Sequence, residues 1–171
     1  MEMIVRKANA TQYQLSFAGH MMRCAIGRSG MTRHKKEGDG ATPVGVWPLR
    51  RVFYRPDRLA KPETRLKIFE LSPADGWCDA ATDPNYNHLV KLPYPASAEE
   101  MWRTDEIYNI VVELGYNDKP VIPGKGSAIF LHIARPKYSP TAGCVAIALT
   151  DMRKLLSSVE PGVVLHVSDQ K

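Results

Sequence analysis

The chain has 171 residues, the length of one ordinary domain rather than two, and such a chain can bury a core without a metal or a disulfide. Hydrophobic residues make up 44% and charged residues 24%, a composition that excludes a disordered chain and a coiled coil. The 23 basic and 18 acidic residues give a net charge of +5, which is compatible with an anionic polymer or an acidic substrate as partner.

Short alternating or apolar runs predict four strands in the first third of the chain, namely Ile4–Lys7, Tyr13–Phe17, Met21–Ile26 and Val46–Tyr54. Pro48 places the last of them at a sheet edge or beside a bulge, because proline cannot donate to a strand ladder. The segment 27–45 holds five glycines and a basic run, and we expect a long surface loop there.

Six prolines interrupt the stretch Arg55–Pro95, where we expect little regular structure. A stretch of this kind is uncommon in a compact domain and is usually functional. We expect two of its segments, 75–79 and 83–87, to lie near the mouth of a site. Ser97 and Glu100 then have the spacing of a capping box, which predicts a short helix to about Ile107.

The C-terminal third predicts two buried strands, a further strand, one helix and a closing strand. The runs 110–114 and 128–133 are nearly continuous in apolar residues, as expected of strands buried on both faces, and 143–149 is a further strand. Thr150 and Asp151 are expected to cap a helix to about Val159, and 163–167 to form the last strand. Eight or so strands and two short helices predict a single mainly β domain over residues 1–171, a sandwich or a partly closed barrel.

The three cysteines, Cys24, Cys78 and Cys144, cannot all pair within one chain, and their wide spacing, without a CxxC, suggests neither a zinc knuckle nor a redox pair. Only Cys144 combines a histidine twelve residues upstream, a glycine directly before it and cationic neighbours. His132 lies near the end of a buried strand, and twelve residues later Cys144 opens the next one. The intervening turn, with Pro136 and Pro140, is long enough for the imidazole and the thiol to face each other across a strand pair.

This arrangement fits nucleophilic catalysis. A thiol of ordinary pKa, near ~8.5, is mostly protonated at neutral pH, and a neighbouring imidazole can take its proton. The amides of Gly143 and Cys144 are candidate donors to an oxyanion, and Arg135 and Lys137 would favour a thiolate or hold a carboxylate. On spacing alone the alternative stays open that His132 and Cys144 are satisfied core residues.

Other candidate sites are weaker. Cys24 lies in an apolar run typical of a core strand, and Cys78 is expected to pack beside Trp77 rather than to be a second exposed thiol. The basic run 33–36 lacks interleaved aromatics, so nucleic-acid binding is not expected, and no histidines have metal-ligand spacing.

No apolar run is long enough to span a membrane. Residues 1–7 lack the apolar stretch of a secretory signal, which leaves a cytoplasmic location or export by a signal outside this chain.

Three ordered motifs resemble the L,D-transpeptidase (YkuD-domain) family. His132 followed by Thr141-Ala142-Gly143-Cys144 resembles the family's histidine and Ser/Thr-x-Gly-Cys signature. The stretch 40–49, which contains Thr42-Pro43, resembles its Thr-Pro-x-Gly-x-Phe segment, and 27–30 resembles the glycine turn before that segment. The resemblance implies a β-sandwich-like fold of mixed sheets, a Cys144 nucleophile and a His132 base, with Thr141 and Gly143 in the catalytic signature.

The reaction implied by the resemblance is acyl transfer between peptidoglycan stem peptides. The thiol would form a thioester with one stem and pass the acyl group to an amine of a second stem, without metal or cofactor. The family also implies a periplasmic or envelope location and, we expect, a monomer. We expect Arg135, Ala142, Tyr116 and Trp77 to contact the substrate.

The chain departs from the family pattern at two positions beside the cysteine. Ala142 and Ala146 stand where the family often has histidine and a polar residue, so the stem position used could be unusual, with L-alanine to diaminopimelate (1,3) crosslinks as one outcome. Two further functions stay open: an L,D-carboxypeptidase of cell-wall recycling, in which water accepts the acyl group, and a non-catalytic cell-wall binding module.

Overall fold

The structure, a computed structural model, describes residues 2–170 and is mainly β with mixed sheets, as predicted. Nine strands form the large sheet, in the order β11-β12-β13-β3-β2-β1-β14-β6-β7. Their bounds are β1 Glu2–Lys7, β2 Tyr13–Phe17, β3 His20–Ala25, β6 Gly45–Tyr54, β7 Ile68–Glu70, β11 Ile110–Leu114, β12 Phe130–Ile133, β13 Val145–Ile147 and β14 Val164–Val167. Because β11 also pairs with β6, the sheet closes on itself around the core.

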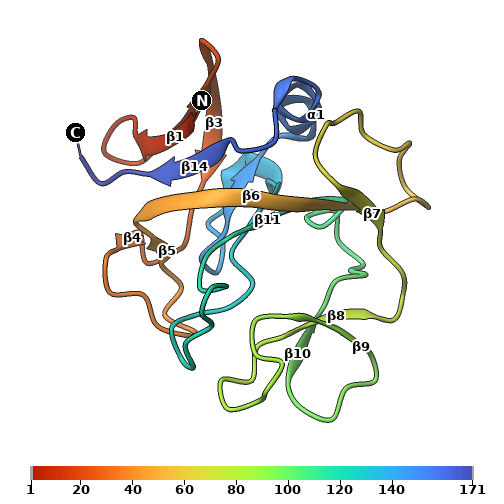
Figure 1. Ribbon diagram of the computed structural model, residues 1–171. Coiled ribbons are helices and arrows are strands. Elements are labelled where there is room, and N and C mark those ends of the chain that lie inside the picture. Colours follow the sequence, from red (N-terminus) through yellow and green to blue (C-terminus); the bar gives the residue numbers. More distant parts are fainter. Residues whose placement is uncertain (1, 171) are drawn as a thin grey trace.

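Two smaller sheets complete the strands. A three-stranded sheet consists of β8 (Asp75–Cys78), β9 (Leu89–Lys91) and β10 (Ala98–Glu100), and it lies apart from the long strand β6 in Figure 1. The two-residue strands β4 (Met31–Thr32) and β5 (Thr42–Pro43) pair within the 27–45 loop. The proline-rich stretch is therefore less irregular than expected, because part of it forms a sheet.

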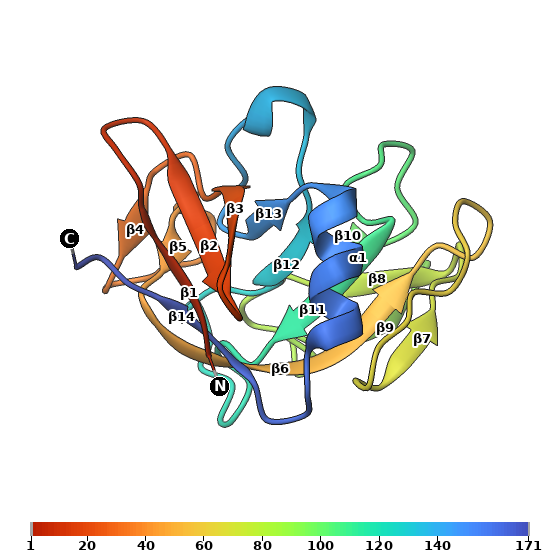
Figure 2. The ribbon, with the colours of Figure 1, turned by 90° about the horizontal axis from the view of Figure 1, so that it is seen from above.

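Among the described residues there is one α-helix, α1 (Leu149–Ser158), together with a short 3₁₀ turn (Pro136–Tyr138). Helix α1 lies beside β12 (Figure 2), and its buried residues Met152, Leu155 and Leu156 belong to the main core. The predicted helix is confirmed, but its cap is not: Ala148 occupies the N-cap position, and no side chain caps the helix.

The helix predicted over 97–107 is wrong. Ala98–Glu100 instead forms β10, in which Glu99 pairs with Trp77 of β8, and Met101 after it is fully buried. The capping-box spacing is a local signal, and here pairing with a distant strand and burial of a large side chain outweigh it.

Pro48 does not lie at a sheet edge. It sits inside β6, where this strand passes from pairing with β14 to pairing with β11. The β6–β11 register shifts between Val112 and Leu114, so the bulge alternative agrees with the structure.

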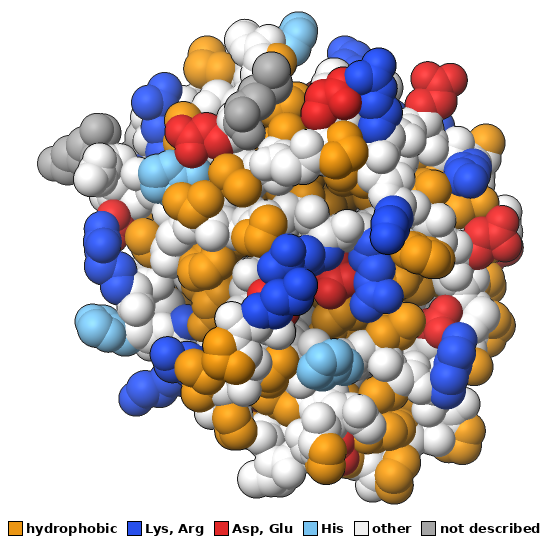
Figure 3. Space-filling model, viewed as in Figure 1, with side chains coloured by type: hydrophobic (Ala, Val, Ile, Leu, Met, Phe, Trp, Pro, Cys, Tyr) orange, Lys and Arg blue, Asp and Glu red, His pale blue; other side chains and the backbone are white. Residues whose placement is uncertain are grey.

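Figure 3 shows basic and acidic side chains side by side on the face of the molecule that Figure 1 presents. Arg51 of β6 forms an ion pair with Glu113 of β11, and Arg50 forms one with Asp118.

Strands β11 and β12 divide the interior into two hydrophobic clusters. Ile110, Val112, Leu131 and Ile133 face the main core, whereas Val111 and Phe130 face a second cluster with Trp77, Tyr108 and Cys144. Since successive side chains of a strand point to opposite faces, His132 shares the face of Phe130. The same alternation in β13 places Cys144 on this face, because Val145 and Ile147 belong to the main core.

Candidate active site

The candidate site lies where two parallel strands present a thiol and an imidazole on one face. The β12–β13 register pairs Leu131 with Val145 and His132 with Ala146, so Cys144 lies level with Phe130. The Phe130 amide donates a hydrogen bond of 3.4 Å to Cys144 Sγ, and the thiol donates to the Ala128 carbonyl at 3.1 Å. Thiol and imidazole thus lie a short diagonal step apart across the strand pair.

Two hollows meet at Cys144. One, of about 320 Å³, is lined by Cys144 and His132 together with Arg103 and Arg135, and we call it the histidine hollow. The other, of about 240 Å³, is lined by Cys144 with Glu37, Asp79 and Ser127, and we call it the acidic hollow. The two share Arg28, Glu99, Tyr108, Ala142 and Cys144 as lining residues.

His132 is buried and holds a defined orientation. Its Nδ1 lies 2.9 Å from the Ile133 carbonyl, an acceptor that favours the tautomer with the proton on Nδ1 and leaves Nε2 able to take a proton. The ring packs edge-on against Tyr108, with 5.4 Å between centroids. Burial lowers the pKa of His132 to about 4, so the resting imidazole is neutral.

The thiol is neutral at rest as well. Burial raises the pKa of Cys144 to about 12, and the carboxylate of Glu99 adds to this, against the Phe130 amide and the ammonium of Lys35. Within residues 2–170 the thiol makes no hydrogen bond to the imidazole. The resting pair is therefore thiol and imidazole rather than thiolate and imidazolium, and proton transfer has to accompany attack on a substrate.

The loop before Cys144 is held by Thr141 and by a glycine conformation. Thr141 Oγ1 accepts the Gly143 amide at 3.0 Å and donates to the Cys144 carbonyl at 2.6 Å. Gly143 has φ +140°, and a Cβ there would lie 2.9 Å from the Ala41 carbonyl, so a side chain is excluded. The Gly143 amide is thus engaged, whereas the Cys144 amide has no acceptor among the described residues and is the better oxyanion donor.

Thr42 joins the three motifs singled out in the sequence. Its fully buried hydroxyl accepts the Gly27 amide and donates to the Gly143 carbonyl, both at 2.8 Å. Thr141 also pairs with the glycine turn, since its carbonyl accepts the Arg28 amide at 2.9 Å. The sequence motif that contains Thr42 indicates no role for this residue, but its hydrogen bonds show that it positions the loop that carries Cys144.

We expect Thr42→Val to lower both stability and acylation. Valine keeps the shape but leaves two buried backbone groups without a partner, a cost of about 1–3 kcal/mol in the free energy of unfolding. Urea unfolding checks the stability, and intact-mass kinetics of Cys144 acylation checks the effect on the site. Thr104→Val, at an exposed position, is the matched control. Equal unfolding midpoints for the two variants would contradict the positioning role of Thr42.

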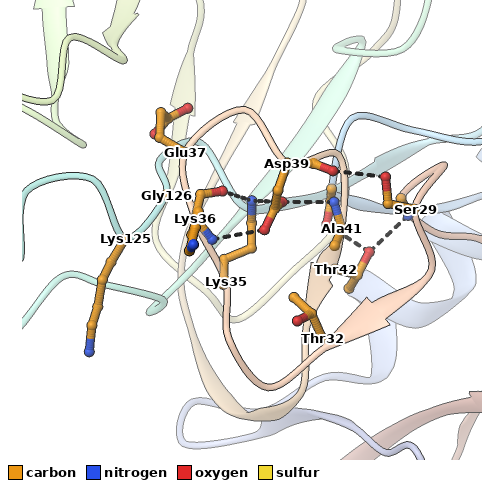
Figure 4. A network of polar contacts seen from close by, with 12 residues as sticks. Ser29, Thr32, Lys35, Lys36, Glu37, Asp39, Ala41, Thr42, Lys125 and Gly126 are labelled. Atoms are coloured by element: carbon orange, nitrogen blue, oxygen red, sulfur yellow. Dashed lines mark hydrogen bonds and ion pairs between the residues drawn. The ribbon is translucent and has the colours of Figure 1, made fainter.

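The loop 33–40 borders the acidic hollow and is organised by Asp39. Figure 4 shows Lys35, Lys36 and Ala41 gathered around this carboxylate, which accepts hydrogen bonds from Lys35 Nζ at 2.5 Å and from the two backbone amides. Partial burial alone would raise the pKa of Asp39, but these hydrogen bonds hold it below its ordinary value. Lys35 lines the acidic hollow, and the carboxylate of Asp39 compensates its positive charge there.

The chain matches one family model over almost its whole length. The model, described as the L,D-transpeptidase catalytic domain (YkuD), covers residues 4–167. The chain belongs to this family. The resemblance seen in the three motifs is thus confirmed.

Comparison with solved structures finds L,D-transpeptidase 1 of Mycobacterium tuberculosis, with 13% identity and a TM-score of 0.40. The match covers 97% of this chain but 61% of that one, so the chain spans less than two thirds of that protein. No curated protein matches the chain. The family match therefore carries the assignment of this L,D-transpeptidase domain.

The structure brings together most of the residues predicted for the site. Cys144, His132, Thr141, Arg135 and Ala142 all line the histidine hollow, and Gly143 lies in the same loop. Arg135 is half-exposed and pairs with Asp105 at 3.1 Å. Ala146 is buried beside His132, so the polar group that the family often carries here is absent from this strand pair.

Tyr116 and Trp77 lie elsewhere than expected. Tyr116 lines a separate hollow of about 430 Å³, where it packs edge-on against Trp47 and donates to the Lys125 carbonyl. Trp77 is buried behind Phe130 in the second cluster and donates to Asn87 Oδ1. Neither side chain lines the hollows at Cys144. Both are large aromatic groups that pack against other aromatic rings instead.

The 83–87 segment nevertheless supports the site. Asn87 Oδ1 also accepts the Ala128 amide at 3.0 Å, and the carbonyl of Ala128 is the acceptor of the Cys144 thiol. Asp79, at the end of the 75–79 segment, lines the acidic hollow. The 75–79 segment therefore reaches the hollow at Cys144, whereas no residue of 83–87 lines either hollow, and this segment contacts the site only through Asn87. Cys24 and Cys78 are buried packing residues, as expected.

The described residues include no group of three His, Cys, Asp or Glu side chains that could hold a metal ion. Within the same residues, no helix is long and apolar enough to cross a membrane.

Proposed function

We propose that this domain is a cysteine-dependent peptidoglycan L,D-transpeptidase in which Cys144 is the nucleophile and His132 the general base. The observation that carries the proposal is the histidine hollow: in a chain of this family, one thiol and one imidazole with a free Nε2 line the same cavity on one face of paired strands. Arg28, Arg103 and Arg135 line this hollow against one carboxylate, Glu99, and Arg103 and Arg135 share Asp105 as an ion-pair partner. The excess of guanidinium groups suits a stem peptide, because such peptides carry carboxylates.

The first half of the reaction forms the thioester. A stem carbonyl enters beside Cys144, His132 Nε2 takes the thiol proton, and the sulfur attacks the carbonyl carbon. The Cys144 amide stabilises the oxyanion, and the imidazolium returns the proton to the departing amine. Before the substrate arrives, burial disfavours both the Cys144 thiolate and the His132 imidazolium. The proton is therefore transferred only when the substrate is bound and the sulfur attacks it.

The second half transfers the acyl group. An amine of a second stem attacks the thioester carbon, His132 accepts a proton from that amine, and the thiolate leaves and recovers the proton from the imidazolium. The products are a crosslinked dimer and the free thiol. In the hydrolytic alternative, water takes the place of the amine and a trimmed monomer is the product.

The stem position belongs to the same proposal. Ala142 lines both hollows and Ala146 lies beside His132, which leaves room where polar groups are common in the family. This supports an unusual donor position, with L-alanine to diaminopimelate crosslinks as the specific case. We also propose that residues 1–171 form one catalytic domain, since the family match spans 4–167 and β1 pairs with β14. From membership of this family we further propose that the domain acts in the cell envelope, and we propose that it is a monomer.

A muropeptide assay tests this function. Purified protein incubated with muropeptides should give crosslinked dimers by mass spectrometry, and the site of each crosslink identifies the stem position. Cys144→Ala should give no product, whereas Cys78→Ala, which removes a buried cysteine away from the hollows, should retain activity. Trimmed monomers without dimers would indicate the hydrolytic alternative, and product from Cys144→Ala would exclude the mechanism.

A further inference from the structure

Glu99 is a carboxylate at the thiol that the mechanism above does not use. It lines both hollows together with Cys144. Its Oε1 accepts a hydrogen bond of 2.6 Å from Tyr108 and lies 3.8 Å from Arg103 Nη1. Pairing of β10 with β8 places it there, and Tyr108 in turn packs against His132.

The acidic hollow as a whole favours a cation. Glu37, Asp79 and Glu99 line it, and Oδ1 of Asp79 is buried with no hydrogen-bond partner among the described residues. Of the two basic residues in its lining, Lys35 is already paired with Asp39, which leaves Arg28. A buried carboxylate oxygen without a donor is costly unless a ligand supplies one, and an ammonium group supplies three.

An acceptor amine presents a proton problem that His132 alone does not solve. At neutral pH the amine is an ammonium ion, which has to lose one proton to become a nucleophile and a second when the amide forms. His132 takes the second and passes it to the departing sulfur. When the amine enters the site as the ammonium ion, the first proton needs another acceptor there.

We propose, on the basis of the function above, that Glu99 binds the acceptor ammonium and takes this first proton, and so directs the thioester toward amines rather than water. The proton moves from nitrogen to the Glu99 carboxylate, the neutral amine attacks the thioester carbon, and its second proton goes to His132. The thiolate leaves and is reprotonated by the imidazolium. Glu99 then releases its proton to solvent, which balances the cycle.

The surroundings of Glu99 suit a group that exchanges a proton. Burial raises its pKa, and the charges of Asp79 and Glu37 act in the same direction, while Tyr108 and Arg103 oppose them. Tyr108 is the positioning residue, because its hydroxyl holds one carboxylate oxygen. The other oxygen, Oε2, makes no hydrogen bond or ion pair within residues 2–170.

The experiment compares Glu99→Gln with wild type in the two half-reactions. Acylation of Cys144, followed by intact mass, should be at least as fast in the variant, because the carboxylate that raises the thiol pKa is gone. Transfer to an ammonium acceptor, measured as the ratio of transfer product to hydrolysis product, should fall at least tenfold. Transfer to hydroxylamine, whose nitrogen is largely uncharged at neutral pH, should stay within twofold.

Glu100→Gln, its exposed neighbour on β10, is the matched control and should behave as wild type in every assay. Tyr108→Phe should lower the transfer ratio in the same acceptor-dependent way but to a smaller extent, and it serves as the test if Glu99→Gln does not fold. An unchanged transfer ratio in Glu99→Gln, or an equal loss with both acceptors, would overturn the role of Glu99. Wild-type protein that acylates but accepts no amine would also overturn it, whereas wild-type protein that never acylates would refute the proposed function itself.

Discussion

His132→Gln is expected to form the Cys144 thioester about 10²- to 10⁴-fold more slowly than wild type, the usual contribution of a positioned general base. The effect should be large because burial keeps the thiol neutral, with its pKa raised to about 12, so little thiolate exists without a base. Glutamine keeps a polar group that can reach the Ile133 carbonyl but cannot accept the thiol proton. Stopped reactions analysed by intact mass measure the acylation rate directly.

His88→Gln is the matched control for this change. His88 also has its Nδ1 at a backbone carbonyl, 2.8 Å from that of Tyr86, but it is exposed and lines neither hollow. We expect its acylation rate to equal that of wild type. If His132→Gln acylates as fast as His88→Gln, another group takes the thiol proton and the assignment of His132 as base is refuted.

The second large effect is on stability in acid. The pKa of His132 is lowered by burial from an ordinary value of 6.5 to about 4 in the folded protein. Between these values the unfolded chain binds a proton that the folded chain does not, so stability falls as the pH falls through this range. One pKa unit corresponds to about 1.4 kcal/mol, and the loss from this residue should reach roughly 3 kcal/mol by pH 4.

Urea unfolding of wild type and His132→Gln at pH 7 and pH 4 measures this contribution. Carboxylates titrate in both proteins and cancel in the comparison, so the variant should lose roughly 3 kcal/mol less on acidification. His88→Gln should lose as much as wild type, because its imidazole is exposed. Equal losses in all three proteins would show that His132 is not buried in its neutral form.

Local sequence patterns predicted the elements that form the catalytic strand pair. The apolar runs 110–114 and 128–133 are predicted as strands buried on both faces, and the structure has β11 and β12 there. Because Cys144 opens the next strand in parallel register, histidine and cysteine came together as their spacing predicted. Such predictions succeed because strand periodicity and turn length are local properties of the chain.

Local signals misled where distant pairing decided the outcome. Ser97 and Glu100 have the spacing of a helix start, yet β10 forms there because β8 offers a partner and Met101 a place in the core. Trp77 and Tyr116 looked like groups for a cleft, but aromatic side chains pack equally well in a core, and nothing in their local sequence distinguishes the two uses.

The sequence by itself thus determined the family, the mainly β fold, and the nucleophile and base that we propose, because these depend on short motifs and on side-chain alternation. The number and charge of the hollows at Cys144 were decided only in the tertiary structure. Thr42, Asp79 and the neighbouring pair Glu99 and Arg103 come from three separate segments, which pairing of strands brings to one thiol. Hydrogen bonds and charges that join such distant residues leave no periodic pattern in a single chain, so the closed sheet and its neighbouring three-stranded sheet had to be seen before their roles could be inferred.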